Sequence, residues 1–331
     1  MSNQESKPSF EGLPILTEKQ QQLTGFVTNN VGSDFVSRAL TGGRIHYVFG
    51  ISTEREETIL KVRSEHYALD PTQPINPQDI FTEWRALSLF HQVLPDLFPR
   101  PIAFSPEIGA LLTTDIIKGG STLSRLLQDG LSTTTLLFRV GNALGRAHHE
   151  LKHMQDSIHF DSDNSTYQLI QAFQFTDLNI PVFSQVANEL SQLPRQLVLG
   201  DVQSTNIGIT PDGNITFFDL ELAHRGNPIF DVGFCLGDLI LRTLDRPDSI
   251  SSTVSAFLEG YESSNPGELN ANNLFLQRIT IGGILFHLFD RKATSIPNEI
   301  IMNRVDKILN MESPTWNTLI NILKGDSSKN K

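Results

Sequence analysis

Acidic and amide side chains gather around a predicted β-hairpin in the second half of the chain. The turn signal PDGN, residues 211–214, stands between the β-rich runs NIGIT and ITFFDLE, and such a signal favours a tight hairpin. If Asp212 and Gly213 are the two loop residues, Asn206 faces Asp219 across the hairpin. Opposed residues of an antiparallel pair carry their side chains on one face, with Cβ atoms about 4.5–5.5 Å apart. The spacing therefore predicts an amide oxygen and a carboxylate side by side.

This pair has the chemistry of a magnesium site. Mg²⁺ binds hard oxygen ligands and keeps room for water and phosphate oxygens. Asp201 stands five residues before Asn206, after a short apolar run that ends in Gly200. A loop of this length can return over the hairpin and bring a second carboxylate close to the same ion. We therefore expect Asn206 and Asp219 to bind Mg²⁺, with Asp201 beside them.

The segments before this hairpin predict a small antiparallel sheet and one helix. Within residues 35–66, three alternating runs separated by turn residues indicate three strands in a meander. A helix is expected from about residue 77, because Asn76 suits the N-cap and Pro77 suits the first helical position. Residues 101–117 then indicate two more strands. Together these elements predict a β-rich N-terminal lobe.

The periodicity becomes helical after the connector Lys-Gly-Gly at residues 118–120. An apolar stripe through Leu144 predicts one long helix. A β-rich stretch follows at 196–222, and further helices are expected around residues 228–243, 250–261, 270–290 and 298–310. The predicted fold class is α+β, with an antiparallel β N-lobe and a mainly helical C-lobe. The expected parts are a tail or helix at 1–25, the N-lobe at 26–117, the C-lobe at 118–323 and a tail at 324–331.

The order and spacing of three polar residues resemble those of kinases. Asp201, Asn206 and Asp219 are spaced like the catalytic-loop Asp, the catalytic-loop Asn and the metal-binding Asp of kinases. GDxxxxN followed by FFDLELAHRGNPIFDVGF is similar to the aminoglycoside-phosphotransferase and choline-kinase branch, whose pattern is HGDxxxxN, then D-F/W-E and G-x-P-x-x-D. The resemblance is strong over residues 197–235 and weaker over about residues 40–235, and beyond that only the helical character agrees. It implies a two-lobed, protein-kinase-like fold.

The resemblance implies a role for each of these three side chains. Asp201 would be the catalytic residue, which accepts or orients the proton of the attacking hydroxyl. Asn206 and Asp219 would hold Mg²⁺ across the phosphates of ATP or GTP. The implied activity is transfer of the γ-phosphate to a hydroxyl of a small molecule, either an aminoglycoside-like compound or another amine or sugar acceptor.

The resemblance also implies the residues that bind the nucleotide. Lys61, in the third predicted strand, would contact the α- and β-phosphates. Glu83 borders the apolar stripe of its helix, where an unpaired carboxylate would be costly to desolvate. A lysine across the lobe relieves that cost. The nucleotide base is expected near backbone groups from Asp115 to Ile117.

The chain departs from the family pattern in the catalytic loop and in the glycine turn. Leu199 occupies the position where His usually precedes Gly-Asp, which removes a hydrogen-bonding ring but no reacting group. The turn LTGGRIHYVFG has two glycines and is not the GxGxxG of protein kinases. Asp231, in GNPIFD, is interpreted as a structural carboxylate that braces the catalytic loop. The role of Glu221 stays open.

Two other functions are compatible with parts of the sequence. Residues 149–153 read HELKH, the HExxH pattern that places two imidazoles on one face of a zinc-peptidase helix. No suitable third ligand follows, and the apolar stripe through His148 turns His149 and His153 toward a solvated face. A pseudokinase that binds without turnover is the other alternative, and the presence of the whole kinase set argues against it.

The composition fits an enzyme that acts on small molecules. With 331 residues, of which 39% are hydrophobic, the chain can bury a large core. A net charge of −11 without a dense basic block argues against nucleic acid or an anionic membrane as a partner. The sequence has neither an apolar run long enough for a membrane span nor a signal-peptide pattern, so we expect a cytoplasmic protein. Cys235 is expected to be a buried thiol. The acceptor, the choice between ATP and GTP, and the oligomeric state stay open.

Overall fold

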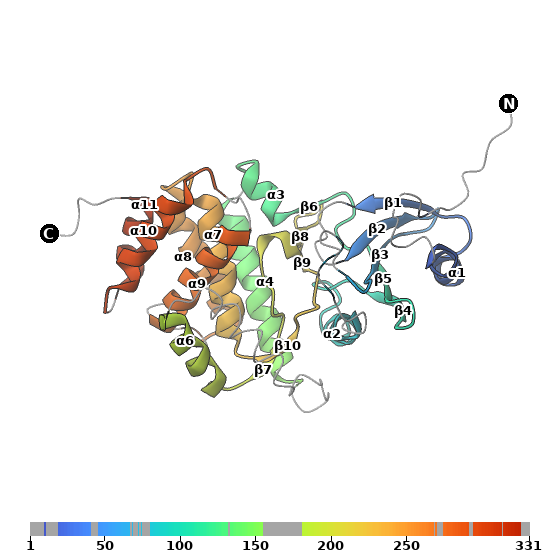
Figure 1. Cartoon of the computed structure of the whole chain (residues 1–331), viewed down its shortest axis with the longest axis horizontal. Coiled ribbons are helices and arrows are strands. Elements are labelled where there is room, and N and C mark those ends of the chain that lie inside the picture. The colour runs from blue at the N-terminus through green and yellow to red at the C-terminus, as the bar shows by residue number, and fades with distance from the viewer. Residues whose placement is uncertain are drawn as a thin grey trace. The chain divides into compact units, whose positions relative to one another are not determined.

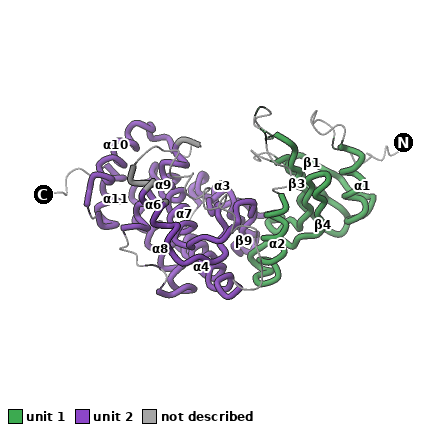
Figure 2. Tube along the Cα trace, turned by 60° about the horizontal axis from the view of Figure 1, so that its bottom comes forward, with its two compact units in different colours: residues 1–119 green, residues 120–331 purple. Residues whose placement is uncertain are grey.

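The computed structural model divides the chain into two units, Met1–Gly119 and Gly120–Lys331 (Figure 2). It describes residues 10, 19–40, 46–66, 68, 72, 74, 80–131, 133–154, 181–267, 269, 274–290, 294–312 and 314–325. The first unit is built on a β-sheet, and the second is mainly helical (Figure 1). This mixed content agrees with the predicted fold class.

The N-terminal unit contains α1 (Gln20–Val31), β1 (Val36–Leu40), β2 (Tyr47–Ser52), β3 (Glu57–Val62), α2 (Ile80–Val93), β4 (Pro101–Ser105) and β5 (Ala110–Thr114). Its strands form one antiparallel sheet in the order β1-β2-β3-β5-β4. The predicted meander and the strand pair that follows it are therefore confirmed. The predicted helix start at residues 76–77 lies outside the described residues.

Alternating burial along β3 separates the two faces of the sheet. Leu60 and Val62 are buried, whereas Lys61 between them is half-buried. Leu60 and Val62 belong to the same hydrophobic core as Leu23 and Val27 of α1. Because successive side chains of a strand point to opposite faces, Lys61 lies on the face of the sheet opposite this core.

Two helices depart from the predicted organisation. α1 runs through the boundary expected at residue 25, because Leu23 and Val27 lie about one turn apart and are both buried. After residue 310 no helix was predicted, and this was wrong, since α11 spans Trp316–Lys324. The Thr315 side chain accepts a hydrogen bond from the Thr318 amide and caps this helix. Its buried residues cover little more than two turns, which leaves only a short periodic signal in the sequence.

The C-terminal unit contains β6 (Ser121–Thr122), α3 (Leu123–Gln128), α4 (Thr134–Lys152), α6 (Pro181–Gln192), β7 (Gln196–Val198), the 3₁₀ turn η4 (Ser204–Asn206), β8 (Ile207–Ile209), β9 (Ile215–Phe217), β10 (His224–Gly226), α7 (Pro228–Thr243), α8 (Ser249–Ser264), α9 (Leu274–Asp290), α10 (Asn298–Leu309) and α11. The predicted β-rich interruption and the helices around it are confirmed. Short sheets pair β7 with β10 and join β6, β8 and β9. In the part of the chain that the structure describes, no helix is both long and apolar enough to span a membrane.

Helix α7 forms the centre of the C-terminal unit, where it contacts α3, α8, α9, β7 and η4. All of its residues are buried, and Cys235 is a buried thiol as expected. Gly237 allows α9 to approach closely, because a Cβ at this position would lie 2.7 Å from α9 backbone atoms. Two carboxylates, Asp231 and Asp238, are buried in this otherwise largely apolar helix, seven residues apart in the sequence.

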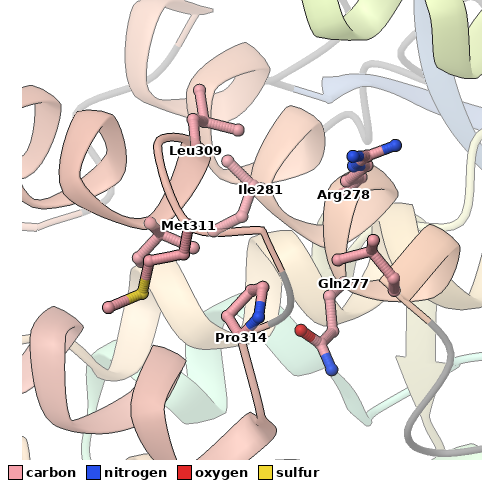
Figure 3. Close-up of a pocket in the computed structure, with 8 residues that line it drawn as sticks. Gln277, Arg278, Ile281, Leu309, Met311 and Pro314 are labelled. Atoms are coloured by element: carbon pink, nitrogen blue, oxygen red, sulfur yellow. The ribbon is translucent and has the colours of Figure 1, made fainter.

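A small pocket in the C-terminal unit lies between α9 and the end of α10 (Figure 3). Gln277 and Arg278 of α9 line it, together with Met311 and Pro314 after α10. None of the residues predicted to form the active site lines this pocket.

Candidate active site

The segment after β7 is held by backbone hydrogen bonds to a buried carboxylate. Asp231 Oδ2 accepts from the Leu199 amide at 2.8 Å, and Oδ1 accepts from the Gly200 amide at 3.0 Å. Gly200 has a φ of +87°, and a Cβ there would lie 2.0 Å from the Leu222 carbonyl oxygen, so only glycine fits. The interpretation of Asp231 as a brace is confirmed by these contacts. They fix the peptide immediately before Asp201.

The Asp201 carboxylate is oriented by two amide side chains. Gln203 Nε2 donates to both carboxylate oxygens, at 2.9 and 2.8 Å. Asn206 Nδ2 donates to Oδ2 at 2.9 Å and to the Asp201 carbonyl oxygen at 3.1 Å. A carboxylate and a carbonyl only accept hydrogen bonds, so the nitrogen of each amide must face Asp201. The carbonyl oxygen of Asn206 then points away from Asp201, where it can serve as a ligand.

The hairpin register differs from the prediction by one residue. Ile207 pairs with Phe217 and Ile209 with Ile215, so the residue across from Asn206 is Phe218, whose amide donates to the Asn206 carbonyl at 3.1 Å. The predicted pairing of Asn206 with Asp219 across an Asp212-Gly213 loop is therefore wrong. Asp219 instead follows the end of β9 with a φ of +64°, a left-handed conformation that is uncommon for a residue with a side chain. This conformation redirects its side chain relative to the strand.

Asp219 and Glu221 together make an oxygen-rich group after β9. A carboxylate oxygen of Asp219 and one of Glu221 lie within 4.8 Å of each other, and both residues are half-buried. Asn206 pairs through its backbone with Phe218, the residue before Asp219, and its side-chain oxygen and the two carboxylates are hard donors of the kind that Mg²⁺ prefers. The donor set fits a magnesium ion.

In the N-terminal unit, Lys61 and Glu83 form a buried ion pair. Lys61 Nζ lies 2.7 Å from Oε1 and 2.8 Å from Oε2 of Glu83, and the two side chains are 12% and 2% exposed. The pair joins β3 to α2 within this unit. The ammonium group of Lys61 compensates the charge of the buried Glu83 carboxylate, which apolar neighbours alone would leave unpaired.

The connector residues Asp115 and Ile117 also lie together. The Asp115 amide donates to the Glu57 carbonyl at 3.0 Å, which continues the sheet pairing. The Ile117 amide donates to Asp115 Oδ1 at 3.2 Å. Burial raises the pKa of the Asp115 carboxyl above its ordinary value, although this hydrogen bond opposes the shift. The predicted residues thus form two groups: Asp201, Asn206 and Asp219 in the C-terminal unit, and Lys61, Glu83, Asp115 and Ile117 in the N-terminal unit.

A family model described as "Phosphotransferase enzyme family" matches residues 37–270. The chain belongs to this family. The match confirms the resemblance drawn from the GDxxxxN segment, and the enzyme class is that of a phosphotransferase. A search of the curated proteins finds no match.

Solved structures share the fold of this phosphotransferase at low sequence identity. A choline/ethanolamine kinase family protein from Mesorhizobium loti is 13% identical with a TM-score of 0.54, over 92% of this chain and 99% of that one. The amicoumacin kinase hAmiN is 16% identical with a TM-score of 0.51, over 92% and 93% of the two chains. The spectinomycin phosphotransferase is 13% identical with a TM-score of 0.50, over 92% and 97%. These similarities confirm the predicted two-lobed, protein-kinase-like fold.

The HExxH segment of the phosphotransferase does not build a metal site among the described residues. His149 and His153 are exposed, and their ring centroids lie 5.3 Å apart. Where the structure describes the chain, no group of three or more metal-ligating residues includes either histidine. The predicted solvated face is confirmed.

Sequence reasoning missed three polar residues around the Asp201–Asn206 loop of the phosphotransferase. Gln203 binds the Asp201 carboxylate, His148 Nε2 lies 3.1 Å from Asp231 Oδ2, and Asp238 accepts from the loop amide of Ser204. Gln203 lies in the variable part of GDxxxxN, so its type carried no signal. The sequence did carry a signal for His148 and Asp238, since each is a polar residue on a buried, largely apolar helix face.

Proposed function

We propose that this phosphotransferase transfers the γ-phosphate of ATP or GTP to a hydroxyl of a small molecule, with Mg²⁺ as cofactor. The observation that carries the proposal is the Asp201 carboxylate, oriented by Gln203 and Asn206 in a loop whose preceding amides are anchored on Asp231. Two groups that can hold a metal ion, Asp219 and Glu221, follow on the adjacent hairpin.

In the proposed reaction, Asp201 orients the acceptor hydroxyl and takes its proton as the oxygen attacks the γ-phosphorus. The bond between that phosphorus and the β–γ bridging oxygen breaks, and the nucleoside diphosphate leaves. Such a base contributes about 10²–10⁴-fold in rate. Asn206, Asp219 and Glu221 would hold Mg²⁺, which neutralises charge on the phosphates when bound. The hydrogen bonds on Asp201 hold its carboxylate in one orientation before substrate arrives.

The residues of the N-terminal unit are proposed to bind the nucleotide. Lys61 would contact the α- and β-phosphates, with Glu83 fixing the position of its ammonium group. The hydrogen bonds to both Glu83 oxygens support this assignment, because they restrict a side chain that is otherwise highly mobile. Backbone groups from Asp115 to Ile117 would contact the base. The Asp115 amide is already used within the sheet, and the Ile117 amide donates to Asp115 Oδ1, so that contact would fall to backbone carbonyl oxygens.

We propose an acceptor that carries an amine or sugar hydroxyls. The net charge of −11 favours a cationic or neutral compound over an anionic one. The names of structural neighbours fit this class: one belongs to the choline/ethanolamine kinase family, and another is a spectinomycin phosphotransferase in complex with ADP and spectinomycin. The hAmiN structure holds AMP-PNP and Ca²⁺, which supports a nucleotide with a divalent cation.

The test is a phosphotransfer screen of small amino alcohols, amino sugars and aminoglycosides, with ATP and with GTP, in the presence of Mg²⁺. Asp201→Ala is expected to lower turnover of any acceptor found by about 10²–10⁴-fold. Asp219→Ala is expected to abolish phosphotransfer, because it removes a proposed ligand of Mg²⁺. Asp212→Asn is the matched control, since Asp212 is an exposed carboxylate of the same hairpin. Full turnover by Asp201→Ala would refute the assignment. Nucleotide binding without turnover of any acceptor would indicate a pseudokinase.

A further inference from the structure

A second buried carboxylate of α7 contacts the catalytic loop. Asp238 is fully buried, and its Oδ2 accepts from the Ser204 amide at 2.7 Å. Its Oδ1 accepts from Arg242 Nε at 2.8 Å, one turn further along the same helix. Both oxygens therefore have partners, and one partner is a backbone group of the loop between Asp201 and Asn206.

The Ser204 amide needs such an acceptor because of the local backbone. Ser204 is the first residue of the 3₁₀ turn η4, and the preceding Gln203 makes no side-chain capping hydrogen bond. Amides at the start of a helical turn have no acceptor within the turn. The turn itself is closed by the Asn206 amide, which donates to the Gln203 carbonyl at 2.8 Å. Asp238 thus caps, from another helix, the turn that presents Asn206.

The spacing on α7 matches two separate points of the loop. Asp231 and Asp238 are seven residues apart. They therefore lie on the same face of α7, separated by about 10 Å along the helix axis. Asp231 binds the amides of Leu199 and Gly200, before the catalytic residue, and Asp238 binds the amide of Ser204 after it. Only three residues, 201–203, lie between the two anchors.

We propose that Asp238 is a positioning residue of the phosphotransfer reaction, which acts through the Ser204 amide to fix the turn that carries Asn206. This inference rests on the proposed function of the loop. Together with Asp231, Asp238 forms a two-point anchor, so the orientation of Asp201 and Asn206 depends on a single buried helix. Loss of the second anchor leaves the loop attached at its start and released at the end that carries the metal-binding amide.

The surroundings of Asp238 keep it charged. Complete burial acts to raise its pKa, but the nearby His287 and Arg242 side chains and the hydrogen bond from Ser204 outweigh burial, so the pKa lies below its usual value. An ionised carboxylate makes stronger hydrogen bonds to backbone amides than a neutral group does. Asp238→Asn therefore removes a charge-assisted bond and places an amide nitrogen or a weaker oxygen before the Ser204 N–H.

Hydrogen exchange measured by NMR on the wild-type chain tests the anchor without any assay of activity. We expect the Ser204 amide to exchange slowly, and Asp238→Asn to accelerate exchange at Ser204 while the β8 and β9 amides keep their protection. Leu239→Ala is the matched control, since Leu239 is an equally buried neighbour on α7 that is not bonded to the loop. An unprotected Ser204 amide in the wild-type chain would overturn the inference.

Kinetics of the same variants test the consequence for the reaction. Asp238→Asn is expected to lower kcat about 10- to 100-fold and to raise the Mg²⁺ concentration for half-maximal rate, at a temperature where circular dichroism shows a folded chain. Leu239→Ala should keep the wild-type Mg²⁺ dependence even if it loses as much stability. Equal effects of both variants on kcat and Mg²⁺ dependence would show a merely structural role and overturn the inference.

Two further outcomes keep the test decisive. If Asp238→Asn does not fold, Asp238→Asn/Arg242→Met removes both members of the buried pair, which avoids leaving an unpaired guanidinium. Wild-type exchange at Ser204 in that double variant would overturn the inference. If the wild-type chain phosphorylates no acceptor, the proposed function fails, whereas exchange at Ser204 still reports on the anchor.

Discussion

The Lys61–Glu83 pair allows stability and function to be separated by one set of variants. Lys61→Met leaves Glu83, which is 2% exposed, without the two hydrogen bonds from Lys61. Breaking a buried pair by removing one partner costs about 3–5 kcal/mol. Lys61 itself is 12% exposed, so water can partly replace it, and we expect the lower end of that range, about 3 kcal/mol. Urea unfolding followed by circular dichroism measures this loss.

The double variant Lys61→Met/Glu83→Leu removes both charges and replaces them with apolar groups. Such replacements of buried pairs are commonly neutral or stabilising, so its free energy of unfolding should lie within about 1 kcal/mol of the wild type. Both Lys61→Met and the double variant should nevertheless lose phosphotransfer, because neither has a lysine at position 61 to contact the phosphates. Recovery of turnover in the double variant would refute the assignment of Lys61 to the nucleotide. Wild-type stability of Lys61→Met would refute the argument about Glu83.

Three further outcomes are expected. Gly200→Ala should lose both thermal stability and turnover, measured by melting and by phosphotransfer, because its Cβ would meet the Leu222 carbonyl at 2.0 Å; unchanged melting would contradict this. Burial and nearby positive side chains lower the pKa of His46 well below 6.5, so His46 binds more protons in the unfolded chain below that pH. Its contribution to the free energy of unfolding should fall on acidification by at most about 1.4 kcal/mol per pH unit. His46→Gln should flatten that slope in urea titrations at pH 7 and pH 5.5. Purified protein should contain no stoichiometric zinc by elemental analysis, and His149→Ala/His153→Ala should keep wild-type phosphotransfer.

The proximity of Asp201 and Asn206 could be predicted because these residues are close in the sequence. Asp201 and Asn206 lie five residues apart, and a hydrogen bond joins their side chains. The strands of the N-terminal sheet were equally accessible, since alternation in runs such as ETILKV reports burial on one face directly. In both cases the residues that must meet are neighbours in the chain or within one hairpin.

The turn signal PDGN does not by itself fix the hairpin register, because it is compatible with loops of two and of three residues. The hairpin closes between Thr210 and Asn214, with the Thr210 amide donating to the Asn214 carbonyl at 2.9 Å and the Gly213 amide donating to the Thr210 carbonyl at 2.8 Å. Gly213 has a φ of +78°, so the loop has three residues, with glycine in the left-handed position. Pro211 suits such a loop, because its fixed φ fits the first turn position. One extra loop residue shifts the strand register by one, which moves every side chain of the shifted strand to the other face of the sheet.

The long-range supports of the loop depend on contacts that no local pattern encodes. Asp238 and Ser204 are separated by 34 positions, and His148 and Asp231 by 83. Periodicity placed these residues on buried helix faces, but which polar partner each would find depends on how α4, α7 and the loop pack. A polar residue within an apolar stripe therefore predicts a buried hydrogen bond without naming its partner.

These supports explain how the loop keeps its anchor although Leu199 replaces the usual histidine. Asp231 holds residue 199 through its backbone amide, and a leucine provides this donor as well as a histidine does. The imidazole that does contact Asp231 comes from His148 of α4. Its Nε2 must donate, because the carboxylate only accepts, and in the neutral ring Nδ1 accepts from the Tyr261 hydroxyl at 2.9 Å. A neutral His148 satisfies both contacts, so the anchor on Asp231 needs no ring at position 199.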